Sequence, residues 1–222
     1  MRIAFLSEGA TEAAFAPGAS DEESWPRAGA LVILVGRILD VRGRIEPWVP
    51  ASGLGAGSGA ILHRGRALLR AGARAGAKGA VMLVDADTKG NQRLATLRGD
   101  REAVLAEKPL LAIPTAIGVA VEKFESWLLG DEICLCRVLK LPNPPEPMGD
   151  PEDLKGKRGA ADDAKAKLNE YLSKDRFGPR PFLEQVRAIA TQMDLDLVAR
   201  RCRSFQQFRD EVRGQLGSLF SA

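Results

Sequence analysis

The chain has few of the side chains that bind zinc. It contains three cysteines, Cys134, Cys136 and Cys202, and one histidine, His63, and it has no Cys-x-x-Cys pair. Structural zinc sites take four nitrogen or sulfur ligands, so the sequence offers no plausible zinc site. Cys134 and Cys136 are too close in sequence for an ordinary disulfide, and the number of cysteines is odd, so a reducing cytoplasm fits best.

The sequence also lacks a long apolar run. Residues 1–6 are apolar but too few for the hydrophobic region of a signal peptide, and acidic residues follow at once. No run approaches the roughly 20 residues that a helix needs to span a bilayer. We therefore expect a cytoplasmic protein that does not bind a membrane.

Neither sign of charge dominates. The chain has 32 basic and 29 acidic residues among 222, for a formal net charge of +3. This balance excludes a histone-like excess, so any binding of a polyanion must come from local clustering of basic side chains. The 45% of hydrophobic residues is enough for a substantial core, and one main domain with a smaller appendage is the simplest expectation.

Short apolar runs alternate with segments of helical composition in the first part of the chain. We expect strands at 2–7, 44–50, 80–84 and 110–113. We expect helices at 28–39, where a strand is the competing interpretation, at 61–78, at 94–107, and from about 119 to 129 or 139. This alternation predicts an α/β fold, a Rossmann-like, mainly parallel sheet of about four strands flanked by helices.

A proline-rich segment, 141–151, follows these elements. We place a boundary there, which gives an α/β domain at 1–140 and a helical C-terminal extension at 141–222, packed on or beside it. Helical composition occurs at 162–172 and 182–193. Ser204-Phe-Gln-Gln207 matches a capping box and predicts a last helix from Phe205 to about residue 216.

Acidic residues directly follow two of the predicted strands. Glu8 comes after the first strand, and Asp85 and Asp87 come after the third. Loops at the carboxyl ends of parallel strands converge, so these acids should be neighbours. Crowded carboxylates repel one another unless a cation neutralises them, and Mg²⁺ prefers such oxygen ligands. The pattern predicts a site for Mg²⁺ or Mn²⁺, and an ordinary polar turn is the alternative for each motif alone.

Three short motifs, in this order, resemble TOPRIM proteins. They are Ser7-Glu8-Gly9-Ala-Thr11-Glu12, Leu83-Val84-Asp85-Ala86-Asp87 and Glu122-Lys-Phe-Glu125-Ser126-Trp127-Leu128-Leu129. The similarity is to small TOPRIM-like families of unknown function in bacterial genomes, some of them encoded beside ATPase genes in anti-phage loci. It covers roughly 1–140, with a weaker echo at Arg203-Ser204-Phe205. The chain departs from the pattern at Pro17-Gly18, which interrupts the segment after Glu12.

The resemblance implies a role for each acid. Glu8 would act as general acid or base, and Asp85 and Asp87 would bind Mg²⁺. Glu12 and Glu125 would complete or support a second metal position. Metals in such sites polarise the phosphoryl oxygen, lower the pKa of the attacking water and stabilise the leaving oxygen.

The resemblance also implies a function. Topoisomerases of this group use a tyrosine nucleophile, but the one tyrosine here, Tyr171, lies in the predicted extension, so hydrolysis by water is expected. The leading hypothesis is therefore a metal-dependent nuclease acting on DNA or RNA, as the effector of a defence system with an ATPase partner. One alternative is a non-catalytic TOPRIM-like interaction module whose acids organise a structural ion. Another is a haloacid-dehalogenase-like phosphatase with Asp85 as nucleophile and Asp87 as acid.

A stripe of cations is the second candidate feature. Arg66, Arg70, Arg74 and Lys78 recur at intervals of four within the predicted helix 61–78, so they would lie along one face. Such a stripe neutralises several backbone phosphates when it binds nucleic acid. A solvated outer face is the competing interpretation.

Overall fold

The computed structural model describes residues 1–7, 29–50, 60–86, 90–121, 123–143, 145, 149–154, 163–175 and 181–221. Its centre is a four-stranded sheet in the order β2-β1-β3-β4, and each neighbouring pair is parallel. The strands are β1 (Arg2–Ser7), β2 (Glu46–Trp48), β3 (Gly79–Asp85) and β4 (Thr115–Ala120). The predicted α/β fold with a mainly parallel sheet is confirmed.

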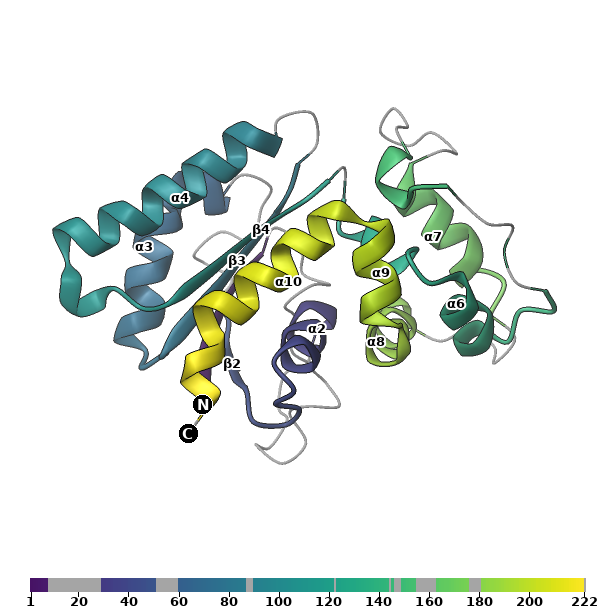
Figure 1. Ribbon diagram of the computed structural model, residues 1–222, viewed down its shortest axis with the longest axis horizontal. Coiled ribbons are helices and arrows are strands. Elements are labelled where there is room, and N and C mark those ends of the chain that lie inside the picture. The colour runs from purple at the N-terminus through teal and green to yellow at the C-terminus, as the bar shows by residue number, and fades with distance from the viewer. Residues whose placement is uncertain are drawn as a thin grey trace.

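Helices cover both faces of the sheet. One face carries α3 (Ala60–Arg74) and α4 (Gly90–Glu107), and the other carries α2 (Ala30–Ile38) and α10 (Arg203–Leu216) (Figure 1). Successive residues of β1 alternate between the two cores: Ile3 and Phe5 pack with α2, and Ala4 and Leu6 pack with α3. Because both faces are buried, the strands are continuous apolar runs, which is why the sequence revealed them.

The C-terminal helices share the core on the α2 side. They comprise α5 (Glu125–Leu128), α6 (Glu132–Leu139), α7 (Ala164–Leu172), α8 (Phe182–Gln192) and α9 (Leu195–Arg201), with 3-10 turns η5 (Pro151–Asp153) and η6 (Gly217–Phe220). A further 3-10 turn, η4 (Pro109–Leu111), lies on the other side, against α3 and α4. Helix α10 packs directly on β4, and a Cβ at Gly118 would lie 2.5 Å from the Phe208 ring. The helical extension therefore supplies α10, which with α2 forms the layer on one face of the sheet, as Figure 1 shows.

Two of the predicted elements are wrong, and a third is a helix that ends earlier than expected. Residues 110–113 are not a strand, because the prolines on either side start η4 at Pro109 and delay β4 until Thr115. The helix expected from 119 is instead the end of β4, followed by the separate helices α5 and α6, with Asp131 capping α6 by accepting from the amide of Cys134 at 2.9 Å. Helix α3 ends at Arg74, before Gly76 at φ +84°, so Lys78 lies outside it.

The predicted capping box at the last helix is also wrong. Helix α10 begins at Arg203 with Cys202 as its N-cap residue, and no side chain caps it. Ser204 therefore lies in the first turn and bonds elsewhere. Among the described residues, no helix is long and apolar enough to cross a membrane.

Candidate functional site

The carboxyl edge of the sheet contains a topological switch point. β1 pairs with β2 on one side and with β3 on the other, so the chain crosses from β1 to β2 in one direction and from β2 to β3 in the opposite direction. In open parallel sheets, ligands bind beyond the carboxyl ends of the strands at this point. β1 ends at Ser7, which pairs with Leu83, and β3 continues to Asp85. The strand topology therefore puts Asp85 at the edge where a ligand is expected.

Asp85 contacts the turn that carries Glu125. Its Oδ1 accepts a hydrogen bond from the backbone amide of Phe124 at 2.9 Å, and its backbone carbonyl accepts from the Arg93 guanidinium. Phe124 is the N-cap residue of α5, and Glu125 is the first residue of that helix. Asp85 and Glu125 are both half-buried. The structure thus brings these two predicted site residues to the same edge, from β3 and from the turn after β4.

The other predicted acids, Glu8, Glu12 and Asp87, lie outside the described residues. Within the described part of the chain, no group of three His, Cys, Asp or Glu side chains is arranged to hold a metal ion. Mg²⁺ usually takes one or two protein carboxylates and completes its octahedron with water. Asp85 and Glu125 supply carboxylates, which are the class of protein ligand that Mg²⁺ takes.

Ser204, in α10, holds the turn between β4 and α5 through hydrogen bonds at both ends of that turn. Its hydroxyl oxygen accepts from the amide of Val121 at 3.2 Å and from the indole nitrogen of Trp127 at 2.8 Å. The same hydroxyl donates to the Glu152 carboxylate, which also accepts from the Ser204 amide at 3.0 Å. Burial raises the pKa of Glu152, and the hydrogen bonds from Ser204 oppose that rise.

An ion pair holds the same turn at its outer side. Lys123 pairs with Asp163, whose carboxylate also caps α7 by accepting from the amide of Lys165 at 2.8 Å. Burial opposes ionisation of Asp163, but these hydrogen bonds prevail and lower the pKa of its carboxyl group. The turn therefore has a partner in α7 as well as in α10.

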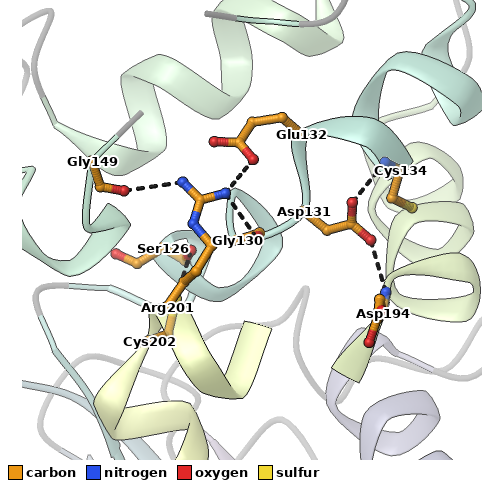
Figure 2. Close-up of polar contacts among 9 residues, drawn as sticks. All are labelled: Ser126, Gly130, Asp131, Glu132, Cys134, Gly149, Asp194, Arg201 and Cys202. Carbon is orange, nitrogen blue, oxygen red and sulfur yellow. Dashed lines mark hydrogen bonds and ion pairs between the residues drawn. The ribbon is translucent and has the colours of Figure 1, made fainter. Parts of the chain in front are cut away.

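Helix α9 anchors the segment that follows α5 (Figure 2). Arg201 donates to the carbonyls of Gly130 at 3.2 Å and Gly149 at 3.0 Å, and it pairs with Glu132. Asp131 accepts from the amide of Asp194 at 2.8 Å, in addition to capping α6. The chain on both sides of α5 is thus tied to the C-terminal helices.

The two buried thiols near this segment are unreactive. Cys202 lies 3.7 Å from the carbonyl of Ser126, and Cys134 lies 3.8 Å from that of Ile189. Burial raises the pKa of Cys134 to about 11 and raises the pKa of Cys202 as well. Both are therefore protonated at neutral pH and pack as small apolar groups.

The predicted basic stripe has a structural role in its first half. Arg66 pairs with the buried Asp100 of α4 at 2.9 Å, and Arg66 and Arg70 both pair with Glu107. Lys78 lies at the opposite edge of the sheet, where its amide donates to the carbonyl of Arg2 at the start of β1. Strand β3 has seven residues, so this edge is roughly 20 Å from Asp85. Arg74 and Lys78 are exposed, and their binding of phosphates stays a prediction.

Residues 54–213 match one protein family, which is described as "Domain of unknown function (DUF4276)". The match spans more than half of the 222 residues. The chain belongs to this family. No curated protein and no solved structure matches the DUF4276 chain. The match includes Asp85, Glu125, Glu152 and Ser204, and it begins after β1.

Sequence reasoning missed Ser204 and Glu152 as parts of this region. Ser204 was interpreted as a helix cap, although it also lies in the Arg203-Ser204-Phe205 echo of the TOPRIM-like pattern, which was a usable signal. Glu152 follows the proline-rich segment and carries no pattern of its own. Its partner Ser204 is 52 residues away, so only the fold reveals the contact.

Proposed function

We propose that this DUF4276 protein is a nuclease dependent on Mg²⁺ or Mn²⁺ that hydrolyses phosphodiester bonds of DNA or RNA at the carboxyl edge of the sheet. The observation that carries the proposal is the position of Asp85, at the end of β3 beside the switch point and bonded to the turn that presents Glu125. The resemblance of the three acidic motifs to TOPRIM proteins supports the same assignment.

The residues divide the work as follows. Asp85 and Asp87 would hold the metal, and Glu12 and Glu125 would complete or support a second metal position. When bound, the metal supplies a Lewis acid that polarises the phosphoryl oxygen and lowers the pKa of water. Glu8, which follows β1 in the sequence, would accept a proton from the attacking water and return one to the leaving oxygen.

A non-catalytic interaction module is the second candidate, and one observation favours it. The Asp85 carboxylate already has a structural task, because it satisfies the amide of Phe124 at the start of α5. In that case the acidic edge would organise a structural ion and the fold would bind a partner. The TOPRIM resemblance indicates an ATPase of an anti-phage system as that partner, for either function.

Asp85→Asn separates these two functions. The asparagine Oδ1 still accepts from the Phe124 amide, so the turn is kept, whereas the negative charge needed for a metal ligand is lost. Plasmid DNA and single-stranded RNA are incubated with purified protein and Mg²⁺ or Mn²⁺. We expect wild type to cleave at least one substrate and Asp85→Asn to be slower by roughly 100-fold or more, as when a transition-state interaction of about 2.7 kcal/mol is lost.

Glu46→Gln is the matched control. It removes the same charge from an exposed acid that pairs with Arg2 at the other edge of the sheet. Its cleavage rate should equal that of wild type. Equal cleavage by Asp85→Asn and wild type, or no cleavage of either nucleic acid by wild type, would contradict the nuclease proposal. An Asp85→Asn protein that still binds a neighbour-encoded ATPase and keeps its biological activity would establish the interaction module instead.

A further inference from the structure

The hydroxyl of Ser204 makes every hydrogen bond that a serine side chain is able to make. It accepts two, from the Val121 amide at 3.2 Å and the Trp127 indole at 2.8 Å, and donates one to Glu152. Ser204 is 4% exposed and Glu152 is 5% exposed, so water does not compete for these bonds. A buried polar group that lost its partner here would cost the full desolvation penalty.

Glu152 is an unusual group to bury at this point. It belongs to η5, and both of its carboxylate oxygens accept from the Ser204 amide, at 3.0 and 3.2 Å. Burying a carboxylate is unfavourable unless hydrogen bonds compensate, and here the amide and hydroxyl of Ser204 both donate to it. Glu152 therefore fixes the direction in which the Ser204 hydroxyl donates. With that direction fixed, the two lone pairs of the hydroxyl oxygen face the Val121 amide and the Trp127 indole.

The Trp127 ring is held by packing against other aromatic rings, in addition to the hydrogen bond of its indole nitrogen. It is fully buried, stacks on Phe208 with centroids 5.2 Å apart, and meets Phe205 and Phe124 edge-on at 5.3 and 5.5 Å. Phe205 and Phe208 come from the same helix, α10, as Ser204. Residues in the first turns of α10 thus contact both the ring and the N–H group of the indole.

These contacts converge on one short turn. Ser204 binds it at Val121 and Trp127, and Asp85 binds it between them at the Phe124 amide. Glu125 lies in the same interval. We propose that Ser204 and Glu152 are positioning residues, which hold this turn in the conformation that places Glu125 beside Asp85. The inference deepens the proposed function, because it assigns the C-terminal helices to the shaping of the metal site.

Amide exchange tests the positioning directly, without any metal. Ser204→Ala removes the acceptor for two donors, and Glu152→Ala removes the group that orients it. In hydrogen exchange of the whole protein, we expect the Phe124 amide to exchange about tenfold faster in both variants, the factor that corresponds to one lost hydrogen bond. Glu152→Gln keeps a carbonyl oxygen for Ser204 and should exchange like wild type.

Thr115→Val is the matched control. Thr115 is 2% exposed, and its hydroxyl donates to the carbonyl of Ile113 at 2.8 Å. It is the first residue of β4, at the end of that strand away from the turn. This variant loses a buried hydroxyl of similar kind and should leave exchange at Phe124 unchanged. Equal acceleration in Thr115→Val and Ser204→Ala would show general destabilisation and overturn the inference, and so would no acceleration in Ser204→Ala.

Titration with Mn²⁺ separates this inference from the proposed function. If both hold, wild type and Glu152→Gln bind Mn²⁺ with similar affinity, and Ser204→Ala binds about tenfold more weakly, for the same lost hydrogen bond. Unchanged Mn²⁺ affinity in Ser204→Ala would overturn the assignment of Ser204 to the site even if exchange at Phe124 accelerates. Accelerated exchange in a protein whose wild type does not bind Mn²⁺ would contradict the proposed function and leave Ser204 as a holder of the turn alone.

Discussion

The two ends of β3 and β4 differ in what their polar side chains do. At the amino end, Arg101 donates to the carbonyl of Thr115 at 3.1 Å and pairs with Glu211 of α10 at 2.7 Å, which fastens one layer to the next. At the carboxyl end, Asp85 and Ser204 both bond to a single short turn that carries a further acid. The contacts at the amino end therefore join the layers of the fold, and those at the carboxyl end hold the turn at which we propose that a ligand binds.

A cavity of about 440 Å³ lies at the amino end and does not change this conclusion. It is lined largely by apolar side chains, such as Leu69, Val104 and Ile113, and its arginine, Arg101, is paired with Glu211. Asp85 and Glu125 lie at the other end of the strands. We therefore place the proposed metal site by these two acids and the switch point, and not by the size of the cavity.

The largest effect should come from Trp127, which joins the carboxyl edge to α10. Trp127→Ala should lower the free energy of unfolding by about 3–5 kcal/mol, because a fully buried indole is replaced by a cavity. Urea denaturation measures this loss. The same change at Trp48, which is half-buried beside β1, should cost clearly less. If Trp127→Ala lowers the free energy of unfolding by no more than Trp48→Ala does, the contacts of Trp127 with α10 do not stabilise the turn as described.

A smaller effect, with a pH dependence, is expected at Glu152. Its pKa is raised by burial from its ordinary value of 4.5, so between that value and the raised pKa the folded state keeps a proton that the unfolded state has released. The free energy of unfolding contributed by this group therefore falls as the pH rises through that window. Glu152→Gln carries no charge and should be more stable than wild type at neutral pH.

The difference between Glu152→Gln and wild type should shrink as the pH falls below the ordinary pKa of 4.5, because the glutamic acid then becomes neutral in both states. Urea denaturation at several pH values between these limits measures it. Glu46→Gln, at an exposed position, should show no such trend. A difference that stayed constant or grew in acid would mean that burial of Glu152 is not what sets its ionisation.

The smallest effect is expected at Arg66, on the far side of the sheet from α10. Its side chain is 53% exposed and pairs with Asp100 and Glu107, so Arg66→Gln should change the midpoint of urea denaturation only slightly. The salt dependence of nucleic-acid binding should stay the same, because this charge is already paired within the fold. If Arg66→Gln instead reduces the slope of log affinity against log salt concentration by about one, Arg66 contacts a phosphate and the basic stripe is a phosphate-binding surface.

The strands β1 and β3, which end at the carboxyl edge, were predictable because each is a continuous apolar run in the sequence. β3 is a continuous apolar run that ends on Asp85, and burial on both faces of the sheet requires that composition. The strand expected at 110–113 failed because apolar composition alone does not establish burial, and Leu110 is fully exposed. The true β4 begins at Thr115, after Pro114, in a stretch to which the sequence assigned no element, and only its end overlaps the helix expected from 119.

The supports of the site were not predictable in the same way. Ser204 bonds to Val121 across 83 residues and to Glu152 across 52, and nothing local to either residue specifies such partners. The local pattern at Ser204 even favoured a different role, a helix cap, because a serine three residues before a glutamine is typical of that motif. Tertiary contacts decided the outcome, since the hydroxyl is buried against the turn.

The most direct test of the account is calorimetric titration of Mn²⁺ into wild type and Asp85→Asn at neutral pH, with Glu46→Gln as control. The account predicts that wild type and Glu46→Gln bind Mn²⁺ alike and that Asp85→Asn binds at least about tenfold more weakly, because a metal ligand is lost while the bond to Phe124 is kept. Equal affinity in all three proteins, or no binding by wild type, would contradict the assignment of this edge as a metal site.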